Sequence, residues 1–235
     1  MLQCWRKVGI FMSKKIQIAI DGPAGAGKST IAKLVAEQLG FTYIDTGAMY
    51  RAVTYKAMKE NINLNDERKL EEMLQSTAIE LQPSPNGQLV FVDGEEVTEK
   101  IRSNEVTANV SKVAAYPSIR KNLVSKQQQL AKGGGVVMDG RDIATHVLKD
   151  AELKIFMSAT VEERAKRRLL DNEKRGIPTD FEKLKEEIAL RDQQDMEREV
   201  SPLVQAEDAI FIDTTDLSID EAVEKILQLA KEKVE

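Results

Sequence analysis

The chain has 235 residues, of which 42% are hydrophobic, and its formal net charge is −5. This composition excludes a disordered chain and argues against nonspecific nucleic-acid binding, which requires a basic surface. Cys4, the single cysteine, cannot form an internal disulfide, and His146, the single histidine, does not suffice for a catalytic zinc site. We therefore expect a folded protein of the reducing cytoplasm.

Residues 1–15 mix apolar and basic side chains and lack the continuous apolar stretch of a signal peptide. We interpret them as an N-terminal extension that precedes the fold. No run of about 18 apolar residues occurs in the sequence, so we expect no membrane partner.

Short apolar segments that alternate with helical ones recur at residues 16–20, 41–44, 135–138, 153–157 and 209–212. This alternation is typical of an α/β fold in which a parallel five-stranded sheet is flanked by helices. Ligands of such sheets bind at the carboxyl ends of the strands, so the loops that follow these segments are the candidate site.

The first strand leads into a segment with every residue type of a phosphate-binding loop at the required spacing, Gly22-Pro23-Ala24-Gly25-Ala26-Gly27-Lys28-Ser29. Backbone N–H groups of such a loop, together with the positive end of the following helix, bind a polyphosphate. Lys28 would reach the outer phosphates, and Ser29 would offer its hydroxyl to magnesium. The alternative is a glycine-rich turn with a solvated lysine. The apolar strand before the loop and the apolar-periodic helix after it, which stops at Gly40, disfavour that alternative.

The second strand is followed by Thr46 and Gly47, which resemble a helix start. Arg51 lies about one and a half turns further on, and its spacing leaves open whether it points into a cleft or into water.

Between residues 61 and 106 the pattern changes to short β-like pieces at about 78–82, 88–92 and 95–97. Turn-forming residues separate them, namely Pro83, Pro85, Asn86-Gly87 and Asp93-Gly94. The pattern predicts a small antiparallel β insertion in the α/β domain.

Acidic and basic residues follow the strand at 135–138, in the order Asp139-Gly140-Arg141-Asp142. An aspartate beside a phosphate-binding loop can hold magnesium directly or through water, so Asp139 is a candidate partner of Ser29. The alternative is a simple turn-forming Asp-Gly pair. Because Arg141 and Asp142 add a cation and an acceptor at the same strand end, we favour a site.

Two arginine clusters lie in the charged region 160–202. Arg191, Asp195 and Arg198 are spaced to share one helical face, and a second cluster consists of Arg164, Arg167 and Arg168. Ion pairing with nearby glutamates is the alternative role for both clusters. Arginine matches phosphate oxygens better than lysine does, so we predict an arginine-rich lid centred on 160–185 that closes the site and excludes water.

The chain offers no obvious serine or cysteine triad. If the acceptor is itself a phosphate, no base is needed, because the nucleophile is already anionic. Transfer between two phosphates requires instead that charge repulsion is cancelled and the reactants are aligned, which Lys28, magnesium and several arginines would supply.

The assembled motifs resemble those of the nucleoside monophosphate kinases, and specifically the bacterial cytidylate kinases of the longer type. The resemblance extends from Ile16 to about Lys231. It rests on five segments in the family's order, 21–30, 45–51, 111–115, 139–142 and 191–195.

The resemblance implies that ATP is the donor, CMP or dCMP the acceptor, and Mg²⁺ the metal, held by Ser29 and Asp139. Cytosine would be read by Ser111, Arg120 and Asp142, the acceptor phosphate bound by Arg51, Arg141 and Arg198, and the sugar bound by Arg191 and Asp195. Thr46, where relatives commonly hold serine, keeps the hydroxyl and counts as a further substrate contact. ATP would contact residues 22–30, Thr30 included, and Arg167. The catalytic residues would be Lys28, Arg141, Arg164, Arg168 and Arg198.

These interpretations divide the chain into the extension 1–15, a core of 16–60, 107–160 and 203–235, a monophosphate-binding insertion at 61–106, and a lid with its adjoining helix at 161–202. We expect a monomer whose partners are small nucleotides.

One alternative is a kinase for UMP, AMP or a metabolite hydroxyl. A hydroxyl acceptor would need a base, and Asp45 or Asp142 could supply it. Another alternative is a nucleotide-dependent switch. The chain lacks the Asn-Lys-x-Asp signature of guanine-specific switches. A nucleic-acid-binding module is disfavoured by the acidic charge and the 5% aromatic content.

Overall fold

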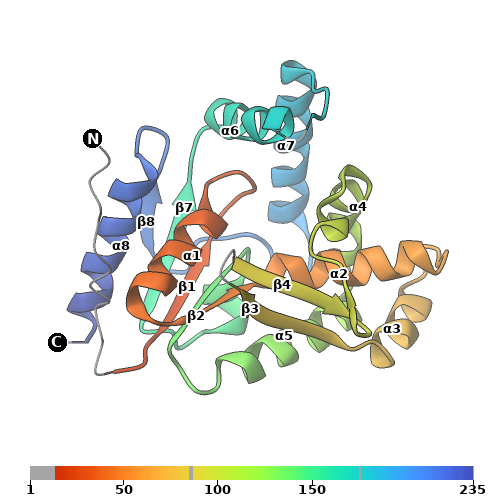
Figure 1. Cartoon of the computed structure of the whole chain (residues 1–235), viewed down its shortest axis with the longest axis horizontal. Coiled ribbons are helices and arrows are strands. Elements are labelled where there is room, and N and C mark those ends of the chain that lie inside the picture. Colours follow the sequence, from red (N-terminus) through yellow and green to blue (C-terminus); the bar gives the residue numbers. More distant parts are fainter. Residues whose placement is uncertain (1–13, 85–86, 175, 235) are drawn as a thin grey trace.

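The computed structural model describes residues 14–84, 87–174 and 176–234. Five parallel strands form the central sheet in the order β2-β6-β1-β7-β8 (Figure 1). They are β1 (Gln17–Asp21), β2 (Thr42–Asp45), β6 (Val136–Gly140), β7 (Leu153–Ser158) and β8 (Ile210–Asp213). The five predicted strands are confirmed, and their bounds shift by one or two residues.

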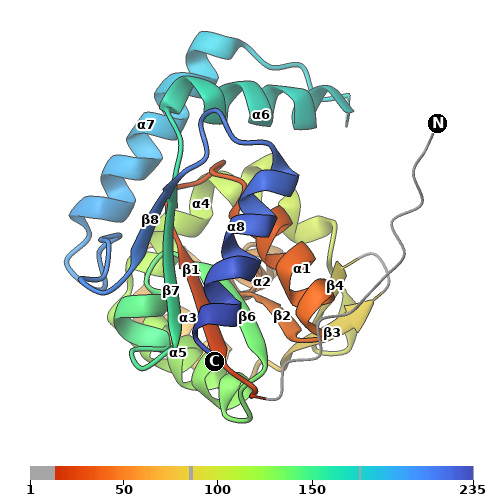
Figure 2. The same ribbon diagram turned by 90° about the vertical axis from the view of Figure 1, so that its left-hand side faces the viewer.

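Helices cover both faces of this sheet (Figures 1 and 2). Side chains of a strand alternate between faces, so Ile18 and Ile20 pack under α1 (Lys28–Leu39) and α8 (Ile219–Glu232), whereas Ala19 faces the opposite side. On that side lie α2 (Thr46–Lys59), α4 (Asn104–Ala115) and α5 (Pro117–Ala131). Both faces are therefore buried, as the apolar strands require.

The region between α2 and α4 contains the predicted antiparallel sheet, made of β3 (Ile79–Ser84), β4 (Gly87–Val92) and β5 (Glu95–Glu96). The predicted turn at Pro85 and Asn86 lies outside the described residues. A short 3-10 helix, η1 (Lys100–Arg102), closes this region.

The same region contains a helix that the sequence reading missed, α3 (Glu67–Gln75). The carboxylate of Asp66 accepts from the N–H of Lys69 and begins the helix, while Leu70, Met73 and Leu74 are buried at helical spacing. Only three apolar positions in a charged segment mark this helix, so its period is easily overlooked.

Two helices, α6 (Val161–Lys174) and α7 (Phe181–Glu197), form a hairpin, and α6 lies across the end of the molecule above the sheet (Figures 1 and 2). The break between them includes Gly176, Ile177 and Pro178. A small separate cluster of Ala165, Leu184 and Ile188 holds the pair together. Among the described residues, no helix is both long and apolar enough to cross a membrane.

Candidate active site

The phosphate-binding loop joins β1 to α1 in a backbone shape that requires glycine. Gly22, Gly25 and Gly27 have φ of 144°, 80° and 86°. A Cβ on Gly22 would lie 1.9 Å from the carbonyl oxygen of Met157. The N-cap of α1 is Gly27, which offers no side-chain acceptor, so the N–H groups of the first turn remain available to a ligand.

Lys28 is buried, and its ammonium donates a 2.7 Å hydrogen bond to the carbonyl oxygen of Pro23. Burial, followed by the charge of Arg141, lowers the pKa of Lys28 to about 7. A bound phosphate would oppose both effects, because it brings negative charge to the ammonium.

A carboxylate at the end of β6 faces the start of α1. The hydroxyl of Ser29 donates to Oδ2 of Asp139 over 2.7 Å, and the hydroxyl of Tyr43 donates to Oδ1 over 2.9 Å. Burial, and then the charge of Asp45, raise the pKa of Asp139. The predicted Ser29 and Asp139 therefore lie together, and Tyr43 joins them although no motif marks it.

The orientation of Arg51, which the sequence left open, is settled by Asp45. This aspartate caps α2 by accepting from the N–H of Ala48 over 2.8 Å, and its other oxygen accepts from Arg51 over 2.8 Å. Although burial opposes it, Arg51 and the Ala48 N–H keep the pKa of Asp45 below its ordinary value. Arg51 therefore points into a cavity at the carboxyl end of the sheet.

This cavity, called the large cavity below, has a volume of about 220 Å³. The residues that line it are Ala24, Gly25, Lys28, Ser29, Asp45, Gly47, Arg51, Arg102, Thr107, Asp139, Gly140, Arg141, Arg168 and Arg191. Six of these side chains are cationic and two are carboxylates. Such an excess of positive charge is suited to polyphosphate.

A second cavity of about 70 Å³, the small cavity, adjoins the first and shares five of its residues, Gly47, Arg51, Gly140, Arg141 and Arg191. The residues that only the small cavity has are Thr46, Tyr50, Val110, Ser111, Ala114, Arg120, Asp142, Asp195 and Arg198. All predicted substrate contacts therefore lie around this space.

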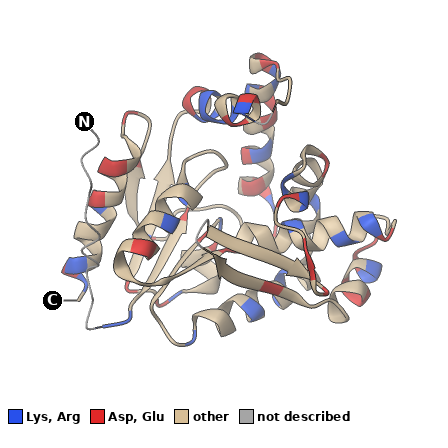
Figure 3. Ribbon diagram, viewed as in Figure 1, with Lys and Arg blue, Asp and Glu red and all other residues tan. Residues whose placement is uncertain are grey.

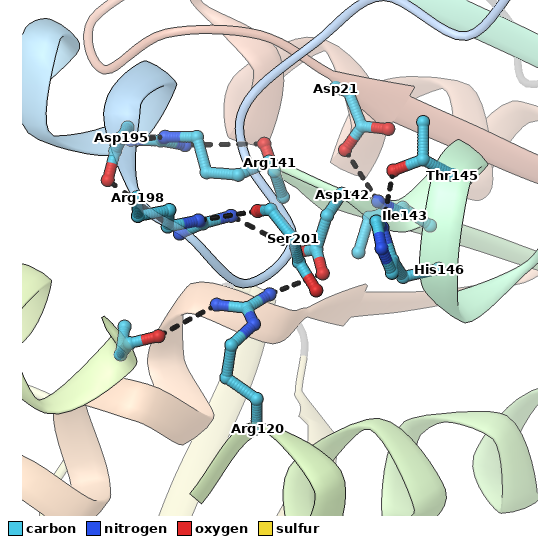
Figure 4. A network of polar contacts seen from close by, with 12 residues as sticks. Asp21, Arg120, Arg141, Asp142, Ile143, Thr145, His146, Asp195, Arg198 and Ser201 are labelled. Atoms are coloured by element: carbon cyan, nitrogen blue, oxygen red, sulfur yellow. Dashed lines mark hydrogen bonds and ion pairs between the residues drawn. The ribbon is translucent and has the colours of Figure 1, made fainter. Parts of the chain in front are cut away.

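Two residues that line the small cavity, Arg120 and Asp142, form a buried ion pair (Figure 4). Arg120 also donates to the carbonyl oxygen of Ala114 over 2.9 Å, and Arg198 lies 3.8 Å from Asp142. Both partners are almost fully buried, so their orientations are fixed.

Asp21 holds the turn that carries Asp142 (Figure 4). Its two carboxylate oxygens accept from the N–H groups of Ile143 and Ala144, each over 2.8 Å, at the start of the π-helical turn η2 (Ile143–Val147). Asp21 also precedes the phosphate-binding loop directly, so one residue joins the loop to the small cavity. Sequence reasoning missed this role, since only the fold brings the two segments together.

Residues at the end of α7 also line the small cavity. Arg141 donates to Asp195 over 2.8 Å, and Nε of Arg198 donates to the carbonyl oxygen of Ser201 over 2.5 Å. Arg198 lies just beyond the helix as its C-cap, yet it still shares the small cavity with Asp195. Arg191 is half-buried, and its Nε is buried without a hydrogen-bond partner among the described residues. Burial, together with the charge of Arg141, lowers the pKa of Arg191 to about 10.

The three arginines of α6 have different surroundings. Arg164 is buried and donates to the carbonyl oxygen of Ala24 over 3.0 Å while it pairs with Asp192 over 2.5 Å. Arg167 pairs with Glu163 and donates to Thr214, beside Gly27. Arg168 lines the large cavity.

Charges of both signs occur along α6 and α7 (Figure 3). Part of these helices does form ion pairs within the helix, the alternative role considered for their charged residues. Lys166 pairs with Glu162, and Lys185 pairs with Glu182. Of the predicted residues, those that line neither cavity are Gly22, Pro23, Ala26, Gly27, Thr30, Arg164 and Arg167.

Comparisons with known proteins agree on one family. Residues 18–232 match the family model for cytidylate kinase. The chain is 72% identical over 223 residues to a cytidylate kinase of Lysinibacillus sphaericus (strain C3-41), covering 95% of this chain and 100% of that protein. It is 59% identical over 222 residues to a cytidylate kinase of Bacillus subtilis (strain 168), covering 94% and 99%.

A solved structure of an uncharacterized protein from Eubacterium ventriosum ATCC 27560 matches with a TM-score of 0.50 at 15% identity, covering 93% of this chain and 99% of that one. At this identity the likeness concerns the fold alone. The family model and the close relatives both extend over nearly the whole chain, so the chain belongs to the cytidylate kinase family.

Proposed function

We propose that this chain transfers the terminal phosphoryl group of ATP to CMP or dCMP, giving ADP and CDP or dCDP. The observation that carries the proposal is the position of Asp142, buried in the small cavity beside the cationic large cavity. A carboxylate accepts a hydrogen bond from the N4 amino group of cytosine, whereas uracil offers a carbonyl there. Arg120 and Ser111 would donate to the acceptors of the ring.

The large cavity would hold the phosphates of both nucleotides. Lys28 and the loop N–H groups would bind the phosphates of ATP, and Arg167, beside Gly27, would contact the same nucleotide. Arg51, Arg141 and Arg198 would bind the phosphate of CMP, while Arg191 and Asp195 would contact its sugar. Thr46, whose hydroxyl donates to the carbonyl oxygen of Asp139 over 2.7 Å, would contact the acceptor as well.

The residues around Ser29 fit magnesium. Mg²⁺ prefers oxygen ligands and binds through one or two protein groups together with water and phosphate oxygens. Ser29 and Asp139 present such oxygens 2.7 Å apart, and a cation would offset the burial that disfavours the charged carboxylate. Ser29 would hold the ion directly and Asp139 through water. Bound magnesium would neutralise phosphate charge.

In the transfer, an oxygen of the CMP phosphate forms a bond to the terminal phosphorus of ATP. The bond from that phosphorus to the bridging oxygen breaks, and ADP leaves with the electron pair. Because the attacking oxygen is already anionic, no base is required. The protein must align the two phosphates and cancel their repulsion.

The region 161–202 would supply the lid and its adjoining helix. Arg168 would reach the transferred group from α6, since it already lines the large cavity. Arg164, whose guanidinium is bound to Ala24 and Asp192, would position the loop for catalysis. The insertion 61–106 would belong to the acceptor side. We further propose a cytoplasmic monomer that acts on free nucleotides, which light scattering with and without nucleotides would test.

A coupled assay of ADP release tests the substrate assignment. Purified protein with ATP and Mg²⁺ is given CMP, dCMP, UMP or AMP at equal concentrations. We expect faster turnover with CMP and dCMP than with UMP and AMP. Equal rates with AMP, or ATP hydrolysis that no monophosphate alters, would contradict the proposal.

A further inference from the structure

Arg102 is the last residue of η1, and its side chain is exposed. The preceding Ile101 is fully buried against α2, so this helix is firmly seated. Lys100, on the same short helix, pairs with Glu95 over 2.5 Å. Within the described part of the chain, the guanidinium of Arg102 makes neither a hydrogen bond nor an ion pair. Its charge favours the ionised form of Asp45.

Asp45 does not explain the presence of Arg102. That carboxylate already has the guanidinium of Arg51 on one oxygen and the N–H of Ala48 on the other. Asp45 therefore does not need Arg102 as a hydrogen-bond partner. The five N–H donors of the Arg102 guanidinium remain available to a ligand.

The position of Arg102 indicates which ligand its guanidinium would bind. It lines the large cavity with Lys28 and Ser29 of the phosphate-binding loop and with Arg141 and Arg191, which also line the small cavity. Arg102 lies at the end of the insertion, and Thr107, in the first turn of α4, lines the same cavity. Arg102 is therefore placed where the phosphates of two nucleotides would meet.

We propose that Arg102 is a catalytic residue that donates to a non-bridging oxygen of the phosphoryl group in transfer. The inference rests on the proposed two-nucleotide function and gives the insertion a part in the chemistry. As the new P–O bond forms and the bond to ADP breaks, negative charge is spread over these oxygens. Arg102 stabilises that charge without taking or giving a proton.

The test compares Arg102→Ala and Arg102→Lys with the control Lys100→Ala, which removes a neighbouring cation outside the cavity. We expect kcat with CMP to fall about 100-fold in Arg102→Ala and to recover in part in Arg102→Lys. The melting temperature and the preference for CMP over UMP should stay as in the wild type. Lys100→Ala should behave as the wild type, since an exposed ion pair contributes little.

A binding measurement gives a readout independent of turnover. The probe is adenosine joined to cytidine through a chain of phosphates, titrated by calorimetry. We expect Arg102→Ala to bind the probe at least about tenfold more weakly, while its affinity for cytidine without phosphate is unchanged.

The proposal is overturned if kcat in Arg102→Ala matches that of Lys100→Ala, or if only the KM for CMP changes. Failure of the wild type to prefer CMP would instead contradict the substrate assignment. In that case Arg102→Ala and Lys100→Ala would be compared with the monophosphate that the wild type prefers. A failure of the Arg102 proposal and a failure of the substrate assignment therefore remain distinguishable.

Discussion

Ser29 and Asp139 are 110 residues apart in the chain, yet the hydroxyl of one donates to the carboxylate of the other over 2.7 Å. The contact joins the first turn of α1 to the end of β6. It exists because β1 and β6 are neighbours in register, which brings the phosphate-binding loop alongside the end of β6. A metal ion held between them would be fixed by the sheet itself.

Asp139→Asn should therefore weaken the response to magnesium. We expect the Mg²⁺ concentration for half-maximal activity to rise about tenfold or more, because an amide orders metal-bound water less well than a carboxylate does. A magnesium titration of the initial rate measures it. Tyr43→Phe, which removes one hydrogen bond but keeps the charge, should have a smaller effect. An unchanged magnesium requirement in Asp139→Asn would refute the role.

Asp142→Ala should reduce the discrimination of CMP from UMP by at least about tenfold, because it removes the group proposed to accept a hydrogen bond from the cytosine amine. The ratio of kcat/KM for the two substrates measures it. Lys28→Ala serves as the comparison, since it should reduce turnover about 1,000-fold with either substrate. An intact preference for CMP in Asp142→Ala would contradict base reading by this residue.

Asp21 should make stability depend on pH. Burial, though opposed by the N–H groups of Ala144 and Ile143, raises its pKa from 3.8 to about 7. The folded protein thus binds this proton more tightly than the unfolded chain does. The contribution of Asp21 to stability is full below the unfolded value of 3.8 and is lost as the pH rises through about 7.

The effect is measured by urea unfolding of the wild type and Asp21→Asn between about pH 5 and about pH 8. Across this range we expect the wild type to lose up to roughly 3 kcal/mol of unfolding free energy relative to the variant, which cannot titrate there. A difference between the two proteins that stays constant with pH would show that Asp21 does not titrate as described.

Gly22 and Gly40 make a matched pair for stability, because both have positive φ but only Gly22 has a close neighbour. A Cβ on Gly22 would lie 1.9 Å from the carbonyl oxygen of Met157, whereas nothing lies within 4 Å of one on Gly40. Gly40→Ala should cost about 1–2 kcal/mol of unfolding free energy. Gly22→Ala should cost more than about 4 kcal/mol or abolish folding. Chemical denaturation measures both, and equal costs would contradict the steric argument.

The parts of the fold that local pattern encodes were predictable. Apolar segments of four to six residues between helical ones mark all five strands of the central sheet. The phosphate-binding loop is marked by its glycines, Lys28 and Ser29. The family resemblance supplied the substrate contacts around Asp142, and these residues do line one cavity.

Contacts made only by the folded chain were not predictable. Tyr43 has no motif of its own and reaches Asp139 because β2 lies beside β6. Asp21 holds the η2 turn across more than a hundred residues, and its position before Gly22 gives no sign of that partner. Arg102 lies among charged residues of similar character, and only its place on the wall of the large cavity distinguishes it.

Asp139 and Asp142 sit at the end of one strand, three residues apart, with Asp139 facing Ser29 and Asp142 in the small cavity. Three residues of extended chain span at most about 10 Å. The backbone separation between the carboxylate proposed to order the metal and the carboxylate proposed to read the base is thus limited by a short, largely buried piece of chain. The proposed movement of α6 and α7 would admit substrates or exclude water without changing that separation.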